Sequence, residues 1–186
     1  VSNHKYGLVY AGLGTLVFRN PAVLPEELVV DIDYLSGETR NFGLNFSRAS
    51  STVILQYFNF LRLGKDGYRE VIVGCLDRAR EVAEAIHASQ VLAGYVEVIS
   101  KTEYLPIVAV KLLDEWQEAP PFTLDELAKG LEEKGWYAPV YYLPADNERV
   151  QVMRIVVRAH FTSVLAAALV KEMETVVKGL VKEAYV

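Results

Sequence analysis

The chain has 186 residues, 52% of them hydrophobic, and its 19 Lys and Arg against 24 Asp and Glu give a formal net charge of −5. This composition is typical of a globular protein. We expect no nucleic-acid partner, because the sequence lacks the basic clusters that bind phosphate. We also expect no membrane anchor, because the longest nearly apolar stretches, residues 8–18 and 163–170, fall far short of the ~20 residues that span a bilayer.

A single cysteine, Cys75, leaves no internal disulfide possible. Since no signal-peptide pattern opens the sequence, a reducing, cytoplasmic setting is expected. Three histidines and one thiol argue against a structural zinc site, and no metal is expected. The chain begins at Val1, within what reads as a structured segment, so we expect a fragment of a longer protein.

The first third of the sequence predicts few long elements. Residues 10–20 read as a glycine-rich turn that leads into a strand over 15–18. Residues 28–35 are irregular or form a short strand. The nearly continuous apolar run 53–63 is expected to be buried on most sides and to end at Gly64.

The remaining sequence predicts a small α+β domain. An amphipathic helix over residues 67–89 connects two parts of the protein. It is followed by the order β-β-α-β-β-α, with strands over 95–100, 107–113, 136–143 and 150–158 and helices over 123–134 and 162–183. Thr123 and Glu126 have the spacing of a capping box. This order describes a sheet covered by helices.

Several familiar catalytic signatures are absent. Gly12 and Gly14 lack the third glycine of a dinucleotide-binding motif and precede a strand where that motif needs a helix. No G-x-S-x-G elbow and no pair of histidines at metal-ligand spacing occurs. Cys75 lies on the apolar face of its predicted helix, where a free cysteine packs as a small hydrophobe.

Two basic residues have apolar neighbours. Lys5 follows His4 among apolar and aromatic residues, and partial desolvation would favour its neutral amine, a nucleophile for carbonyls. Taken alone, a solvated surface lysine is the commoner role. Strand alternation puts Arg154 on one face with three valines, where a buried guanidinium needs an anion. That anion is an internal carboxylate, the commoner case, or the carboxylate of a ligand.

Seven short segments carry a specific resemblance. They are Ser2-Asn3-His4-Lys5-Tyr6-Gly7, Leu24-Pro25-Glu26-Glu27-Leu28-Val29, Tyr34-Leu35, Asn45-Phe46-Ser47-Arg48, Arg62-Leu63-Gly64, Gly67-Tyr68 and Met153-Arg154-Ile155. In this order and spacing they resemble glutamate decarboxylase, a pyridoxal-phosphate enzyme of the group II decarboxylases. The resemblance runs from Val1 to roughly Leu180.

The resemblance implies an α/β protein with the pyridoxal-phosphate-dependent transferase fold, which is aspartate-aminotransferase-like and called fold type I. Residues 1–64 would be the C-terminal end of the large pyridoxal-phosphate-binding domain, and residues 65–90 a connecting helix. Residues 91–186 would be the complete small C-terminal α+β domain, in agreement with the element order.

The resemblance also implies roles for four residues. Lys5 matches the lysine that forms a Schiff base with pyridoxal 5'-phosphate, and His4 matches the histidine that contacts the cofactor phosphate. Ser47 matches a serine that reaches a phosphate across a dimer interface, which implies a homodimer or a higher homo-oligomer. Arg154 matches the arginine that binds a substrate carboxylate.

The implied activity is the decarboxylation of L-glutamate to 4-aminobutanoate and CO2. The chain is expected to be inactive alone, because the family's other cofactor and substrate ligands lie in its N-terminal two-thirds. Asn3 replaces a glycine common in the family, Ala11 a proline and Thr15 a tryptophan, and none of these carries catalytic chemistry. No calmodulin-binding tail of the kind found in plant relatives is visible.

Two other functions remain open. Another pyridoxal-phosphate-dependent amino-acid decarboxylase or lyase would share Lys5 and differ in its substrate pocket, although Asn-Phe-Ser-Arg favours glutamate. A non-catalytic α+β interaction module would leave Lys5 solvated and Arg154 internally paired. We also expect the chain by itself to expose apolar surface around residues 6–18 and 53–63 and to aggregate.

Overall fold

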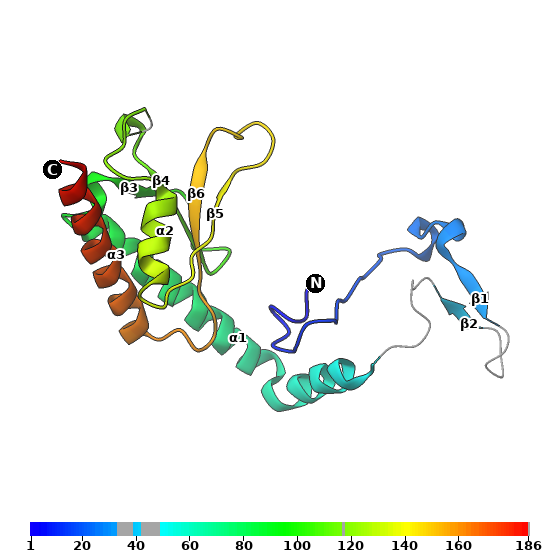
Figure 1. Cartoon of the computed structure of the whole chain (residues 1–186). Coiled ribbons are helices and arrows are strands. Elements are labelled where there is room, and N and C mark those ends of the chain that lie inside the picture. The colour runs from blue at the N-terminus through cyan, green and yellow to red at the C-terminus, as the bar shows by residue number, and fades with distance from the viewer. Residues whose placement is uncertain (33–38, 42–48, 117, 186) are drawn as a thin grey trace. The chain divides into compact units, whose positions relative to one another are not determined.

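The computed structural model describes residues 1–32, 39–41, 49–116 and 118–185. It divides the chain into two compact units, Val1–Tyr68 and Arg69–Val186. The long helix α1 (Ser51–Ala88) crosses the boundary between these units (Figure 1). Inside it, Gly64 has φ 58° and ψ −166°, a conformation open to glycine but strained for other residues, so the helix breaks where the sequence predicts. The division into segments 1–64, 65–90 and 91–186 stays a prediction.

The first unit contains little regular structure besides the start of α1. Its other elements are the short helical turns η1 (Pro21–Val23) and η2 (Glu26–Leu28) and the antiparallel pair β1 (Val30–Ile32) and β2 (Thr39–Asn41). Strand β1 confirms the short strand expected within residues 28–35. The strand predicted over residues 15–18 is wrong. Only an isolated bridge between Ser2 and Gly14 forms nearby, and residues 15–18 have no partner strand among the described residues.

The second unit is built on a four-stranded antiparallel sheet with the strand order β3-β4-β6-β5. These strands are β3 (Val96–Val98), β4 (Ile107–Leu112), β5 (Val140–Tyr142) and β6 (Gln151–Val156). Helix α2 (Leu124–Glu132) lies between β4 and β5 in the sequence, and α3 (Ser163–Ala184) follows β6. The turns η3 (Leu92–Gly94) and η4 (Asp114–Trp116) flank the β3–β4 pair in the sequence. The predicted order β-β-α-β-β-α is confirmed.

One face of this sheet forms a hydrophobic core with the three helices. On β4, Val108, Val110 and Leu112 are buried, and in the register they lie opposite or beside core residues of β3 and β6. Fully buried partners come from the helices: Val82 and Ile86 of α1, Leu127 and Leu131 of α2, and Met173 and Val177 of α3. Because strand side chains alternate, Ala109 and its register partner Arg154 lie on the other face of the sheet.

The predicted capping box closes the N-terminus of α2. The Thr123 hydroxyl accepts a hydrogen bond from the Glu126 N–H at 3.2 Å, and the Glu126 carboxylate accepts one from the Thr123 N–H at 2.7 Å. The bond from the Thr123 N–H, and after it a bond from the Thr123 hydroxyl to the same carboxylate at 2.9 Å, lower the pKa of the Glu126 carboxyl below its ordinary value of 4.5. Since the folded pKa is the lower one, the stabilisation is present above pH 4.5 and is lost as pH falls through the folded pKa.

We expect Thr123→Ala to weaken this cap. At pH 7 the hydrogen-exchange protection of the first turn of α2 should fall about fivefold, which corresponds to ~1 kcal/mol. As pH falls through the folded pKa of Glu126, the difference from the unaltered chain should narrow, because protonation of Glu126 removes the acceptor of the bond from the Thr123 hydroxyl. Thr175→Ala, which removes an exposed hydroxyl on α3, is the control. A difference that stays constant as pH falls would show that the bond between the Thr123 hydroxyl and the Glu126 carboxylate does not contribute.

The N-terminal half of α1 carries an exposed apolar surface. Its large side chains Ile54, Tyr57 and Leu61 are 63%, 63% and 68% exposed. The prediction that residues 53–63 are buried on most sides is therefore wrong for the chain by itself, since the first unit is too small to cover them. The prediction that an isolated fragment exposes these residues is confirmed. Among the described residues no helix combines the length and the apolarity that a bilayer crossing requires.

This apolar surface predicts self-association of the 186-residue chain. We expect the double variant Phe58→Glu with Leu61→Glu to lower the aggregated fraction measured by static light scattering, because it breaks the apolar surface with charge. A matched control, Tyr137→Glu with Val164→Glu, alters exposed apolar residues of the second unit and should have little effect. A monomeric, cooperative unfolding transition of the unaltered chain would contradict this prediction.

Candidate functional site

Lys5 lies in a tight turn of the first unit. The backbone N–H groups of Lys5 and Tyr6 both donate to the Ser2 carbonyl, at 3.0 and 3.2 Å. The side chains of His4, Lys5 and Tyr6 are all exposed, so the expected partial desolvation of Lys5 is not found in this chain. Among the described residues the Lys5 amine has no hydrogen-bond or ion-pair partner. An exposed primary amine therefore follows an exposed imidazole in the sequence of this turn.

A buried hydrogen-bond network anchors this turn to α1, with Gln56 at its centre. The Gln56 Oε1 accepts a bond from Asn3 Nδ2 at 2.8 Å, while its Nε2 donates to the Gly7 carbonyl at 3.2 Å and to the Tyr68 hydroxyl at 2.8 Å. Tyr68 in turn donates to the Gly7 carbonyl at 2.9 Å. Sequence reasoning missed Gln56. The sequence feature that could have indicated Gln56 is its polar amide within the apolar run 53–63.

The anchoring requires a glycine at position 7. A Cβ there would lie 2.1 Å from the Gln56 Oε1 and 2.6 Å from the Asn3 carbonyl oxygen, so any other residue would force the network apart. The next residue, Leu8, has a positive φ of 58°, which costs a non-glycine residue energy. Asn59 on α1 donates to the Leu8 carbonyl at 3.0 Å and supports this conformation.

The network also reaches the segment that follows the turn. The Thr15 hydroxyl donates to Asn3 Oδ1 at 2.9 Å, and the backbones of Val1 and Thr15 exchange two hydrogen bonds. Asn3 is only 4% exposed, and both ends of its amide are used. The turn that carries Lys5 is thus held by α1 on one side and by residue 15 on the other.

Arg154 is a partly buried cation that has no anionic partner among the described residues. Its guanidinium lies over the ring of Tyr141 on β5, with Cζ 5.3 Å from the ring centroid, a cation–π contact. Its Nε is buried and has no hydrogen-bond partner. The internal carboxylate that sequence reasoning held to be the commoner partner is not found among the described residues. The arrangement leaves the guanidinium available to the carboxylate of a ligand.

The predicted site residues fall in different parts of the chain. Lys5 and His4 adjoin in the first unit, and Arg154 belongs to the second. Ser47 lies outside the described residues, and its predicted role stays a prediction. Cys75 is buried in the core of the second unit, where burial raises the pKa of its thiol, so its predicted packing role is confirmed.

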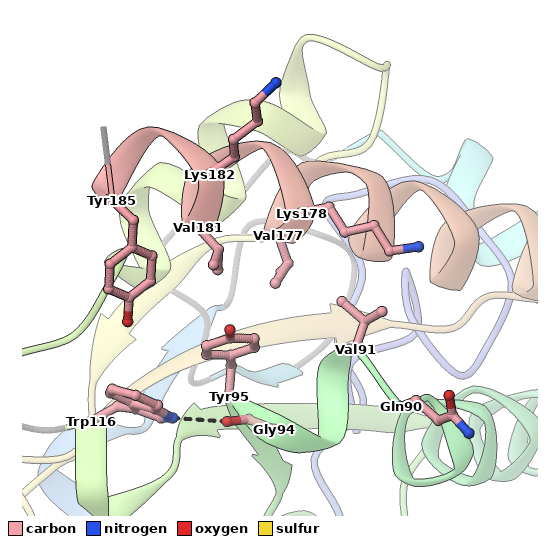
Figure 2. A pocket seen from close by; sticks show the side chains of 10 residues that line it. All are labelled: Gln90, Val91, Gly94, Tyr95, Trp116, Val177, Lys178, Val181, Lys182 and Tyr185. Carbon is pink, nitrogen blue, oxygen red and sulfur yellow. Dashed lines mark hydrogen bonds between the residues drawn. The ribbon is translucent and has the colours of Figure 1, made fainter.

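A cavity of about 470 Å³ in the second unit contains none of these residues. Figure 2 shows its floor, where Tyr95 and Trp116 stack with ring centroids 5.7 Å apart, and its roof on α3. The Trp116 indole N–H is already bound to the Gly94 carbonyl at 2.8 Å, and the Lys182 ammonium points away from the cavity. Most of the lining is apolar or aromatic, and none of the residues predicted for the site takes part in it.

Comparison with known proteins connects the Lys5 turn to a family. Residues 1–112 match the family described as the pyridoxal-dependent decarboxylase conserved domain. Glutamate decarboxylase 5 of Arabidopsis thaliana is 42% identical over 180 residues, which is 97% of this chain and 35% of that protein. Glutamate decarboxylase beta of Listeria innocua is 37% identical over 96% of this chain and 37% of its own length. The chain thus spans about a third of the length of these curated relatives.

Solved structures agree with these sequence comparisons. The glutamate decarboxylase of Lactobacillus brevis superposes with a TM-score of 0.83 at 36% identity, over 96% of this chain and 39% of that one. The sphingosine-1-phosphate lyase of Burkholderia pseudomallei superposes with a TM-score of 0.74 at 16% identity, a likeness of fold alone. The fold is that of the fold-type-I pyridoxal-phosphate enzymes, as predicted from the sequence.

The chain belongs to the pyridoxal-dependent decarboxylase family. The predicted resemblance to glutamate decarboxylases is confirmed, and pyridoxal phosphate is confirmed as the cofactor of the family. The residues present fit this cofactor. Lys5 supplies an exposed primary amine on an anchored turn, His4 supplies an exposed imidazole at the preceding position, and Gly7 supplies the close packing that fixes the turn.

Proposed function

We propose that this chain is the part of a glutamate decarboxylase that carries the cofactor lysine, Lys5, and the substrate-binding arginine, Arg154. The whole protein would convert L-glutamate to 4-aminobutanoate and CO2. The observation that carries the proposal is the buried Nε of Arg154, which has no partner in the described part of the chain. A cation without an internal carboxylate there suits a carboxylate substrate. The names of the relatives at 37–42% identity support glutamate as that substrate.

Each residue would have a definite task. Pyridoxal phosphate, when bound, supplies an electron sink for cleavage at the α-carbon of an amino acid. Lys5 would hold the cofactor through its amine, and His4 would bind the cofactor phosphate. The two parallel N–H groups of the Arg154 guanidinium would hold a substrate carboxylate in one plane and so orient the bond to be broken. The Tyr141 ring would limit the movement of that guanidinium.

We further propose that the active protein is at least a homodimer in the cytoplasm. The proposal follows from the resemblance at Ser47, whose counterpart reaches a phosphate across the subunit interface. The exposed apolar surface on the N-terminal half of α1 supports it, since such surfaces commonly mark interfaces.

The test uses the full-length protein that contains these residues. It is incubated with pyridoxal phosphate, reduced with borohydride and digested, the modified peptide is mapped, and CO2 release from glutamate is measured in parallel. We expect modification at Lys5 together with CO2 release. Modification without CO2 release would keep the cofactor and move the substrate to another amino acid. No modification of Lys5 would overturn the proposal in favour of a non-catalytic module.

A further inference from the structure

We propose that Gln56 is a positioning residue that fixes the backbone of Lys5 relative to the cofactor; this inference rests on the proposed function. Gln56 contacts the turn at two points, Asn3 and Gly7, which lie two residues before and two residues after Lys5. A single side chain on α1 therefore holds both flanks of the residue that would bind the cofactor. The lysine side chain between them stays exposed.

The chemistry of these two contacts requires an amide. Asn3 presents a donor and Gly7 presents a carbonyl acceptor, so the bridging group must accept at one atom and donate at the other. Gln56 accepts from Asn3 and donates to Gly7, and its Nε2 also donates to the Tyr68 hydroxyl at 2.8 Å. A glutamate could not donate to the Gly7 carbonyl, and a methionine of similar length could do neither.

Packing alone does not account for a glutamine at this position. Gln56 is 4% exposed and lies in a helical run that is otherwise nearly apolar, and burying an amide costs free energy unless its hydrogen bonds are made. An apolar side chain of equal length would fill the same space but would leave the buried Asn3 Nδ2 without this acceptor. What the amide adds is a fixed relation between α1 and the two flanks of Lys5.

Tyr68 reinforces this relation. Its hydroxyl donates to the same Gly7 carbonyl at 2.9 Å while accepting from Gln56, which closes a triangle of hydrogen bonds. A displacement of the Lys5 turn away from α1 would break several of these bonds at once. A displacement toward α1 would drive Gly7 against the Gln56 amide.

The test compares Gln56→Met with a matched control, Gln90→Met, in the full-length protein. Gln90 is exposed in the second unit, and its substitution should leave every readout unchanged. For Gln56→Met we expect an unchanged KM for glutamate and a kcat about a hundredfold lower, the cost of a misplaced reacting group. We also expect a shifted pH midpoint of the visible absorbance of the bound cofactor, a signature that loss of stability alone would not produce.

Tyr68→Phe provides a second, milder variant that decides the matter if Gln56→Met does not fold. It removes one hydroxyl and should shift the pH midpoint in the same direction by a smaller amount. Midpoints and kcat values equal to those of the unaltered protein would overturn the inference. If the variants equal the unaltered protein while that protein binds the cofactor at Lys5 and decarboxylates glutamate, only the positioning role fails. If the unaltered protein neither binds the cofactor nor decarboxylates glutamate, the proposed function fails and this inference fails with it.

Discussion

Lys5→Arg in the full-length protein is expected to lower the rate of CO2 release from glutamate by at least about a thousandfold, since the nucleophile itself is removed. Arginine keeps the positive charge but stays protonated at any working pH, so it offers no neutral amine to a carbonyl. The Lys5 side chain is exposed and has no partner among the described residues, so the fold should not change. The measurement is CO2 release together with the visible absorbance of the bound cofactor.

Lys65→Arg is the matched control for this variant. Lys65 is an exposed lysine of the same unit, near the break in α1, and its replacement should leave both the absorbance and the rate unchanged. Equal activity of Lys5→Arg and the unaltered protein would contradict the cofactor role and favour the interaction module. Loss of activity with an unchanged absorbance would move the cofactor to another lysine.

Arg154→Met is expected to lower kcat/KM for glutamate about a hundredfold or more, because no other group on that strand can hold a carboxylate with two parallel bonds. Arg154→Lys should recover little of it, since an ammonium is a point charge without the planar fork. The structure adds an opposite expectation for stability. Removing a partly buried cation whose Nε has no partner should leave the free energy of unfolding unchanged or raise it.

Lost activity together with retained stability would distinguish the two roles considered for Arg154, which are binding a substrate carboxylate and pairing with an internal carboxylate. If the residue were internally paired in a structural module, its truncation would strand a carboxylate and destabilise the fold by ~3–5 kcal/mol. Chemical denaturation of Arg154→Met measures this directly. Arg149→Met, at an exposed arginine in the loop before β6, is the control and should alter neither quantity.

Local signals explain why the second unit was predicted well. Thr123 and Glu126 mark the start of α2, and Gly135, with a φ of 85°, lies just beyond its end. Strand limits differ from the predicted ones: the strand expected over 95–100 is Val96–Val98, because a strand extends only as far as its neighbour pairs with it. The strand predicted over residues 15–18 does not form for the same reason, because no described strand pairs with these residues.

The site was predictable only in part. The strand position of Arg154 implied an anion, and the structure narrows the choice by showing no internal carboxylate among the described residues. Lys5 could be recognised from its neighbours in the sequence only through the resemblance. Gln56 could not be found that way, because its partners Asn3 and Gly7 are 53 and 49 residues away and hydrogen bonds over such separations leave no periodic pattern.

The contact between Asn3 and Thr15 bears on how this turn evolves. Both positions depart from the residues that the resemblance leads one to expect, a glycine and a tryptophan, and the two departures are joined by a hydrogen bond of 2.9 Å. A glycine at position 3 would leave the Thr15 hydroxyl without this acceptor, and a tryptophan at position 15 would leave Asn3 Oδ1 without this donor. The two positions are therefore expected to covary among homologues, each substitution persisting where the other is already present.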